Sequence, residues 1–329
     1  MSATQTASGP PALDYVVQTI TTSDGAQLGV RDFGSRRDAD RTIVLLHGLG
    51  LSQDSWTSQI RRLITRWGSS IRIVSFDHRG HGSSTPAPKH TYQIERLGAD
   101  LAEVLTALGI TGPVTIAGHS MGGMAALAYL ARPFSEQPIQ ADGLVLIATA
   151  AGKLAERGLG RLLATPATAL LCELVNLPPH AATDHLIQAL ARPACLALNA
   201  SGALSRAHRK ALTDIVATCL TATPLTTAVG FLPGLRRYNV YAALPTITAR
   251  TIVVSGGADI LTPTAHALDL VAGIDYATHL HLPGGGHMLL QEAPHLVGAA
   301  LERAMCGPAA HTRRASPPRP TRPRVLEAI

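Results

Sequence analysis

The stretch Val114–Gly123, with the sequence VTIAGHSMGG, decides the fold that we expect for this chain. It begins with an apolar run of the kind found in buried strands. It continues as G-x-S-x-G between Gly118 and Gly122, and the helix-forming sequence MAALA follows at residues 124–128. The pattern predicts a strand, a sharp turn that holds the Ser120 hydroxyl outward, and a helix whose first N–H groups face that hydroxyl.

Glycine is expected on both sides of Ser120 for a steric reason. A sharp strand-to-helix turn strains the backbone, and it brings the positions two residues before and after the serine close to neighbouring elements. Side chains at Gly118 and Gly122 would collide there, so we interpret both as supporting residues of the turn. The motif alone could arise by chance in a chain with 30 glycines, so the strand and helix around it carry the prediction.

Short apolar runs elsewhere in the chain predict the rest of a mostly parallel sheet. They are rich in branched aliphatic residues and lack polar alternation, which is typical of strands buried on both faces. Helix-like segments such as Leu97–Leu108 separate them, and this order predicts a doubly wound α/β fold, entered through an antiparallel hairpin. The expected strands are Tyr15–Thr22, Gln27–Asp32, Thr42–Leu46, Ile71–Phe76, Val114–Ala117, Gly143–Ile147, Thr251–Ser255 and His279–Leu282.

The strand rhythm stops between residues 152 and 245, where Ala- and Leu-rich helical stretches take over. We therefore predict one α/β core made of residues 15–151 and 246–306, with a helical cap at 152–245 inserted between two strands. The segments 1–14 and 307–329 are predicted to be disordered. The second of them contains five Arg and five Pro and few apolar residues, so it has little surface to bury.

Charge and cysteine usage exclude several classes of protein. The net charge is +6, but the tail 307–329 holds five Arg and one Glu, a net +4, which leaves +2 for the rest. A nucleic-acid binder would concentrate basic charge on a folded face, so no nucleic-acid partner is expected. The four Cys show no CxxC pairing, no apolar run approaches the ~20 residues of a membrane span, and no signal-peptide pattern opens the chain. These features predict a cytoplasmic protein.

Several motifs in a fixed order resemble the α/β-hydrolase superfamily. They are the loop Leu45–Gly50 (LLHGLG), the turn Asp77–Ser84 (DHRGHGSS), the motif Gly118–Gly122, and the late pair Gly256–Asp259 (GGAD) and Gly286–His287. The turn and the serine motif together resemble monoacylglycerol lipases and related carboxylesterases. The resemblance implies an α/β-hydrolase fold with a helical cap and a catalytic serine.

Ser120 needs a neighbouring base, because a free hydroxyl is a poor nucleophile. His287 follows three glycines after the strand predicted at His279–Leu282, in a loop able to place an imidazole over the sheet. That imidazole needs a carboxylate to fix its tautomer, and Asp259 follows the strand before it. The order Ser120, Asp259, His287 is the one that the resemblance implies.

Other placements of the acid are weaker. Some members of the superfamily carry it after the preceding strand, but residues 148–152 (ATAAG) contain no carboxylate. Asp269 and Asp275 lie farther along the chain in helical and loop contexts. Asp259 could also cap the helix that follows Thr262-Pro263, a role that is compatible with catalysis.

The resemblance also implies two backbone N–H donors for an oxyanion. One belongs to Met121, directly after the serine, and the other to Leu49, in the loop after the third strand. We expect His47 to brace that loop without taking part in the chemistry, and Gly48 to support it.

The expected function is hydrolysis of a carboxylic ester with a hydrophobic acyl group, through an acyl-enzyme (EC 3.1.1). A C–C bond hydrolase, a cofactor-free perhydrolase and a non-catalytic binding protein are alternatives. No G-x-G-x-x-G after a first strand, no G-x-x-x-x-G-K-[ST] and no HExxH is present, so we expect neither cofactor nor metal. A small hydrophobic ester is the expected partner, with weak membrane-surface contact through the tail as a further option. The oligomeric state stays open.

Overall fold

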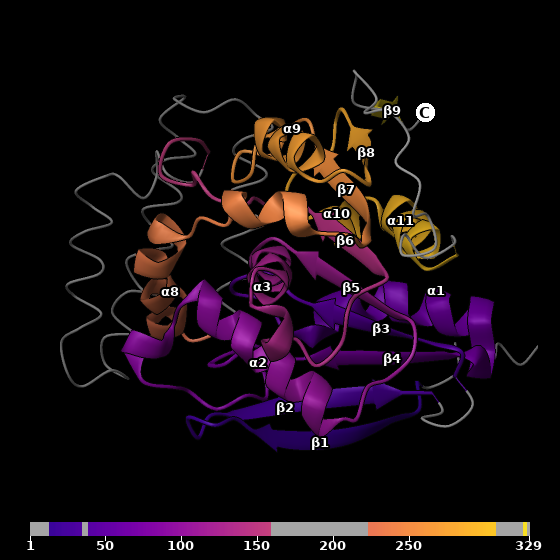
Figure 1. The fold of residues 1–329 in the computed structure, drawn as a ribbon, viewed down its shortest axis with the longest axis vertical. Helices are drawn as coiled ribbons and strands as arrows, with labels where there is room; N and C mark the ends of the chain where they lie inside the picture. Colours follow the sequence, from indigo (N-terminus) through magenta and orange to yellow (C-terminus); the bar gives the residue numbers. More distant parts are fainter. Residues whose placement is uncertain (1–12, 35–38, 159–222, 307–324, 328–329) are drawn as a thin grey trace, which may run out of the picture.

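A computed structural model describes residues 13–34, 39–158, 223–306 and 325–327. In this part of the chain nine strands form one sheet, in the order β1-β2-β4-β3-β5-β6-β7-β8-β9. The sheet runs across the molecule from β1 at the bottom of Figure 1 to β8 near the top. The strands are β1 (Tyr15–Thr21), β2 (Gln27–Phe33), β3 (Arg41–Leu46), β4 (Ile71–Phe76), β5 (Val114–His119), β6 (Gly143–Ile147), β7 (Arg250–Gly256), β8 (Ala277–Leu282) and β9 (Val325–Glu327).

The direction in which successive strands are added to the sheet reverses at β3, near the centre of the sheet. β1 pairs with β2, and β2 with β4, in antiparallel fashion, and every other pairing is parallel. From β3 the chain first adds β4 on one side and then β5 on the other, where Leu46 lies opposite Gly118. In doubly wound sheets the crevice beyond the carboxyl ends of such neighbouring strands is the usual ligand site. The turn that carries Ser120 leaves β5 at this crevice.

Helices cover both faces of the sheet, and each face has its own apolar core. α2, α3, α8 and α9 pack on one face, and α1, α10 and α11 on the other. Figure 1 shows α8 beside α2. The helices are α1 (Thr57–Trp67), α2 (Ile94–Ala107), α3 (Met121–Leu130), α8 (Leu225–Arg237), α9 (Thr264–Gly273), α10 (Leu289–Glu292) and α11 (Pro294–Cys306), and the 3₁₀ turns are η1 (Gln53–Trp56), η2 (Gly68–Ser70), η3 (Lys89–Thr91), η4 (Phe134–Glu136) and η5 (Tyr241–Thr246).

The predicted α/β-hydrolase architecture is confirmed, with a mostly parallel sheet between helices. The runs predicted at Ile71–Phe76 and Gly143–Ile147 coincide with β4 and β6. β5 is longer than predicted, because the strand continues through Gly118 to His119 before the turn. His119 is therefore the last residue of a strand.

The predicted cap lies mostly outside the described residues. Of the range 152–245, the structure describes residues 152–158 and 223–245, where α8 and most of η5 are found. The predicted disorder at 1–14 likewise falls almost wholly on residues that are not described. No helix in the described ranges is both long and apolar enough to cross a membrane.

The end of the chain differs from its predicted disorder at three residues. Val325–Glu327 forms β9, which pairs in parallel with β8 at the edge of the sheet. The backbone of β8 offers hydrogen-bonding groups on its outer side, and any extended segment can pair with such an edge. The composition of a tail does not show this pairing, because it depends on the backbone alone.

Helices α2 and α3 approach each other so closely that a glycine is required between them. A Cβ at Gly98 in α2 would lie 2.7 Å from the backbone N of Tyr129 and 2.8 Å from the backbone C of Ala128. Backbone atoms cannot swing aside as a flexible side chain can. The contact therefore fixes α3, the helix that follows Ser120, against the rest of the core.

We predict that Gly98→Ala lowers the free energy of unfolding by ~1–3 kcal/mol, the usual cost of overpacking. Gly298→Ala in α11 is the matched control, because its Cβ would meet only the flexible end of Arg62, with Cδ at 2.5 Å. That variant should change stability by no more than ~1 kcal/mol, since Ala also favours the helix. Urea unfolding of both variants measures the difference, and equal effects would contradict the account of the α2–α3 contact.

Candidate active site

Ser120 occupies a strained backbone conformation between β5 and α3. Its φ is 52° and its ψ is −119°, a region that non-glycine residues rarely adopt. Neighbouring groups hold it there: its N–H donates to the Ile147 carbonyl at 2.9 Å, and the Thr149 hydroxyl donates to its carbonyl at 2.7 Å. The end of β6 and the loop after it thus hold the serine from outside its own turn.

The glycines around Ser120 have no room for a side chain. A Cβ at Gly118 would lie 2.4 Å from the backbone C of Gly122, and a Cβ at Gly122 would lie 2.3 Å from the Leu46 carbonyl oxygen. The steric reason given for these two glycines is confirmed. Close packing of β5, α3 and β3 leaves the Ser120 side chain only the outward direction.

Two loops bring a histidine and a carboxylate to Ser120. His287 follows β8 and Asp259 follows β7, two strands that lie side by side in the sheet. His287 Nε2 lies 3.0 Å from Ser120 Oγ, and His287 Nδ1 lies 2.9 Å from Asp259 Oδ2. The three predicted residues therefore form one chain of hydrogen bonds. The side chains of His287 and Asp259 are buried.

Asp259 is held as a carboxylate by several donors. Its Oδ1 accepts the N–H groups of Leu261 and Thr262 at 2.8 and 2.9 Å, and the Thr262 hydroxyl donates to Oδ2 at 2.7 Å. Burial on its own would raise the Asp259 pKa, but the charge of protonated His287 and the hydrogen bonds from His287 and Thr262 outweigh it and lower the pKa to about 2. An ionised Asp259 requires His287 to carry its proton on Nδ1, which leaves Nε2 to accept the serine proton.

His119 supports the histidine loop from directly before the serine. Its Nε2 lies 2.8 Å from the His287 carbonyl, so this nitrogen carries the proton and donates. The two imidazoles lie 5.1 Å apart. Burial and the charge of His287 lower the His119 pKa to about 3, so His119 is neutral. A second positive charge would otherwise face His287.

The predicted oxyanion loop lies against Ser120. A Cβ at Gly48 would approach the Ser120 Cβ to 3.1 Å, which shows how close the backbone comes. Leu49 follows in this loop, and Met121 is the first residue of α3, where backbone N–H groups have no partner within their own helix. The loop and the helix start therefore border the Ser120 hydroxyl on two sides.

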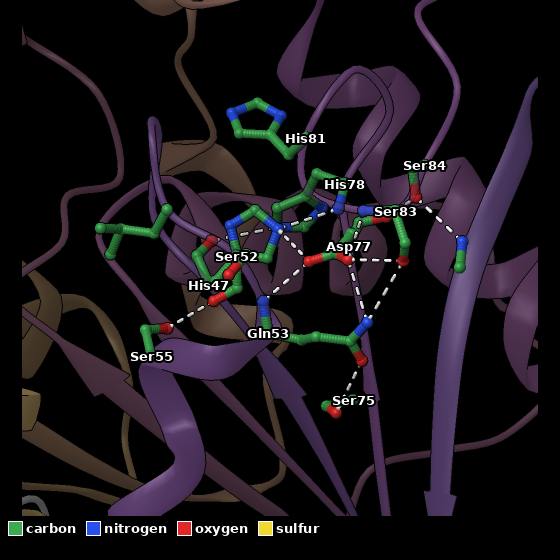
Figure 2. Close-up of polar contacts among 12 residues, drawn as sticks. His47, Ser52, Gln53, Ser55, Ser75, Asp77, His78, His81, Ser83 and Ser84 are labelled. Atoms are coloured by element: carbon green, nitrogen blue, oxygen red, sulfur yellow. Dashed lines mark hydrogen bonds and ion pairs between the residues drawn. The ribbon is translucent and has the colours of Figure 1, made fainter. Parts of the chain in front are cut away.

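His47 fixes the peptide group that joins Gly48 to Leu49. Its Nδ1–H donates to the Gly48 carbonyl at 2.8 Å, and its Nε2 accepts the N–H of His78 at 2.9 Å. Figure 2 shows this Nε2 facing both the backbone N of His78 and the Asp77 carboxylate. In a planar trans peptide the C=O and N–H point in opposite directions, so fixing the Gly48 carbonyl also fixes the Leu49 N–H. The predicted bracing role of His47 has a geometric basis.

The weaker candidates for the acid lie apart from this chain of hydrogen bonds. Asp269 on α9 accepts a hydrogen bond from Arg157 at 2.9 Å and another from Tyr241 at 2.7 Å. Asp275 makes no hydrogen bond to His287, whose Nδ1 is already bonded to Asp259. Among the described residues, no three His, Cys, Asp or Glu side chains gather as a metal site would require.

Sequence reasoning missed three residues that hold the site, namely Thr149, Thr262 and His119. Thr149 lies in the loop of residues 148–152, which has no carboxylate, and it is the one residue there with a polar side chain. Thr262 lies three residues after Asp259, at the spacing of a side chain that closes a turn on it. Both threonines stand out in the sequence, but the groups to which they bond depend on how the loops pack together.

A family model described as the alpha/beta hydrolase family matches residues 43–300, which span β3 to α11. The match covers most of the chain and every element that carries a predicted site residue. The chain belongs to the alpha/beta hydrolase family. The solved structures that resemble the chain share less than a quarter of its sequence, so they support the fold alone.

Two curated relatives match this chain over about a third of its length and over little more than a third of their own. It is 37% identical over 113 residues to a non-heme haloperoxidase of Rhodococcus erythropolis, which covers 34% of this chain and 38% of the relative. It is 36% identical over 113 residues to a bifunctional esterase/perhydrolase of Acinetobacter calcoaceticus, with the same coverage. Among solved structures, the enol-lactonase from Burkholderia xenovorans has a TM-score of 0.66 at 21% identity, over 88% of this chain and all of the other.

We predict that Asp259→Asn lowers kcat by on the order of 10⁴, because Asn can hold His287 in the wrong tautomer. Asp269→Asn is the matched control and should keep most of its activity, since Asp269 is bonded to Arg157 and Tyr241 instead. Steady-state kinetics on one ester substrate compares them. Near-normal kcat for Asp259→Asn beside a severe loss for Asp269→Asn would move the acid to Asp269.

The low pKa of Asp259 also predicts a pH dependence of stability. Its native pKa of about 2 lies below the value of ~3.9 for an unfolded aspartate, so the carboxylate stabilises the fold at pH values above ~3.9. This contribution falls as the pH drops towards 2. Urea unfolding between pH 5 and pH 2 should show the gap between the wild type and Asp259→Asn narrowing. A gap that widens towards pH 2 would contradict the low native pKa.

Proposed function

We propose that this hydrolase cleaves carboxylic esters with a hydrophobic acyl group through an acyl-enzyme on Ser120. The observation that carries the proposal is the chain of hydrogen bonds from Ser120 Oγ through His287 to Asp259, at 3.0 and 2.9 Å. A serine hydroxyl, a properly held imidazole and a buried carboxylate in this order form the arrangement that activates a serine nucleophile. We assign Ser120 as nucleophile, His287 as base and Asp259 as the acid.

Two half-reactions follow from this arrangement. His287 Nε2 accepts the proton of Ser120 while Oγ bonds to the acyl carbon, and the same proton then passes to the leaving alcohol oxygen as the ester C–O bond breaks. A water molecule next gives its proton to His287 Nε2 as its oxygen bonds to the acyl carbon. The acyl–Oγ bond breaks, the acid leaves, and Ser120 recovers its proton.

The charge that forms in each step is stabilised by groups that are already in place. The tetrahedral intermediate carries a negative oxygen, for which we assign the N–H groups of Leu49 and Met121. The loss of one such donor typically costs ~10²–10³ in rate. The imidazolium that forms on His287 faces the ionised Asp259, and His119 adds no second positive charge because burial and the charge of His287 lower its pKa.

The choice of an ester bond rests on the name of a relative. A bifunctional esterase/perhydrolase is 36% identical to the chain over 113 residues, and its name includes the proposed activity.

Perhydrolysis is the second candidate, and the names of the relatives favour it. Both curated relatives reported above carry a haloperoxidase or perhydrolase name. The chemistry differs only in the second half-reaction, in which hydrogen peroxide replaces water and the product is a peracid. The same Ser120, His287 and Asp259 would serve both reactions.

We predict that Ser120→Ala loses ester hydrolysis while keeping its melting temperature, because the hydroxyl is needed only for chemistry. Ser23→Ala, which removes an exposed hydroxyl bonded to Glu103, is the matched control and should keep full activity. A tenth of wild-type activity left in Ser120→Ala would overturn the nucleophile assignment.

The wild-type enzyme should show kcat/KM rising by about a decade or more as the acyl chain of a nitrophenyl ester is lengthened from acetyl to medium chain, since each buried CH₂ contributes ~0.8 kcal/mol.

The same preparation distinguishes the alternatives. Peroxide-dependent oxidation in acetate buffer, with little preference for chain length, would establish the perhydrolase. Fast cleavage of a vinylogous diketone beside a flat ester profile would establish a C–C hydrolase. No turnover and no reaction with a serine-directed probe would leave only a binding protein.

A further inference from the structure

A second histidine contacts the oxyanion loop, in addition to His47. His81 comes from the turn after β4, is fully buried, and lies above His78 in Figure 2. Its Nε2 lies 3.2 Å from the backbone N of Gly50, and its Nδ1 lies 3.1 Å from the Arg79 carbonyl. Because a carbonyl can only accept, Nδ1 carries the proton. Nε2 is therefore the acceptor for the Gly50 N–H.

Together the two histidines fix successive peptide groups of the loop. The Gly48 carbonyl accepts from His47 Nδ1 at 2.8 Å and from the Leu51 N–H at 3.2 Å. The next peptide group, which joins Leu49 to Gly50, is fixed by His81 through its N–H. The Leu49 N–H belongs to the first of these peptide groups, and the second follows it directly across the Leu49 Cα. Release of the second group would free the backbone on the far side of Leu49 and let the loop that carries this N–H shift.

The surroundings of His81 keep its ring in place and uncharged. Burial first, and the charge of His47 second, lower its pKa to about 3, so Nε2 keeps its lone pair at neutral pH. The ring lies 5.2 Å from that of His47 and 5.7 Å from that of Phe231 on α8. Phenylalanine would fill the same space, so packing alone does not require a histidine here. What histidine adds is an acceptor for the Gly50 N–H and a donor for Arg79.

We propose that His81 is a positioning residue of the oxyanion hole. By holding the Gly50 N–H it fixes the peptide group that follows Leu49, and so keeps in place the loop that carries the Leu49 N–H, whose own peptide group His47 holds. The inference rests on the proposed ester hydrolysis. His81 touches neither substrate nor Ser120 and acts only through the loop backbone. The His81 ring also packs against Phe231 of α8, so the described part of the predicted cap contacts the residue that holds the loop.

The test compares His81→Gln with His81→Met, two side chains of similar length. Gln can accept from the Gly50 N–H and donate to the Arg79 carbonyl, whereas Met can do neither well. Each variant is assayed for kcat and KM on the best nitrophenyl ester, for melting temperature, and for inhibition by a trifluoromethyl ketone with the same acyl chain. That ketone forms a tetrahedral oxyanion on a catalytic serine, so its affinity reports the state of the hole.

His81→Met should lose about tenfold to a hundredfold in kcat and a similar factor in ketone affinity, as expected for a donor moved by about 1 Å. KM should stay within about twofold, because uniform binding is not affected. His81→Gln should recover most of both losses. Unchanged ketone affinity in His81→Met would overturn the proposal, and so would equal losses in the two variants that follow their melting temperatures.

A measurement on the wild type covers the case in which His81→Met does not fold. The ¹⁵N chemical shifts of the His81 ring separate a protonated nitrogen from an accepting one, and we expect Nε2 to be the unprotonated nitrogen at pH 7. A protonated Nε2 would overturn the proposal. A wild type that hydrolyses no ester but shows this tautomer would instead refute the proposed function and leave the contact with the loop in place.

Discussion

The strained backbone of Ser120 is the constraint on which the rest of the site depends. A residue with φ of 52° and ψ of −119° is held only when its surroundings leave no alternative, and here the end of β6 and the first turn of α3 bond to both of its peptide groups. The absence of a side chain at Gly118 and Gly122 lets β5 and β3 pack closely against the start of α3. The fold thus determines the direction of the hydroxyl.

Two arrays of hydrogen bonds lie beside that hydroxyl. One runs from Ser120 through His287 to Asp259. In it Thr262 donates to the Asp259 carboxylate, and His119 donates to the His287 carbonyl. The other lies behind the oxyanion loop, where His47 and His81 fix successive peptide groups. Burial keeps His47, His81 and His119 neutral by lowering the pKa of each, so they act as fixed donors and acceptors. His287 has the closer carboxylate to offset its charge, with Asp259 Oδ2 2.9 Å from its Nδ1 against 3.7 Å between His47 Nε2 and Asp77 Oδ1.

The sequence could predict the sheet because strands buried on both faces leave uninterrupted aliphatic runs, and β4 and β6 coincide with such runs. It could also predict that Ser120, Asp259 and His287 lie together, since each follows a strand in a loop that contains glycine. The sequence could not predict the role of His81, because its partner Gly50 lies 31 residues away. The two residues come together only because β3 and β4 pair in the sheet. For the same reason β9 depends on an open sheet edge, which composition does not reveal.

The central claim is that Ser120 is the activated nucleophile. A fluorophosphonate reacts covalently with a serine that a neighbouring base has activated, so labelling of the intact protein followed by peptide mapping tests the claim directly. We predict one phosphonyl group per chain, located on Ser120, and much slower labelling of His287→Ala. An adduct on any other residue, or no adduct on a folded wild-type protein, would contradict the account.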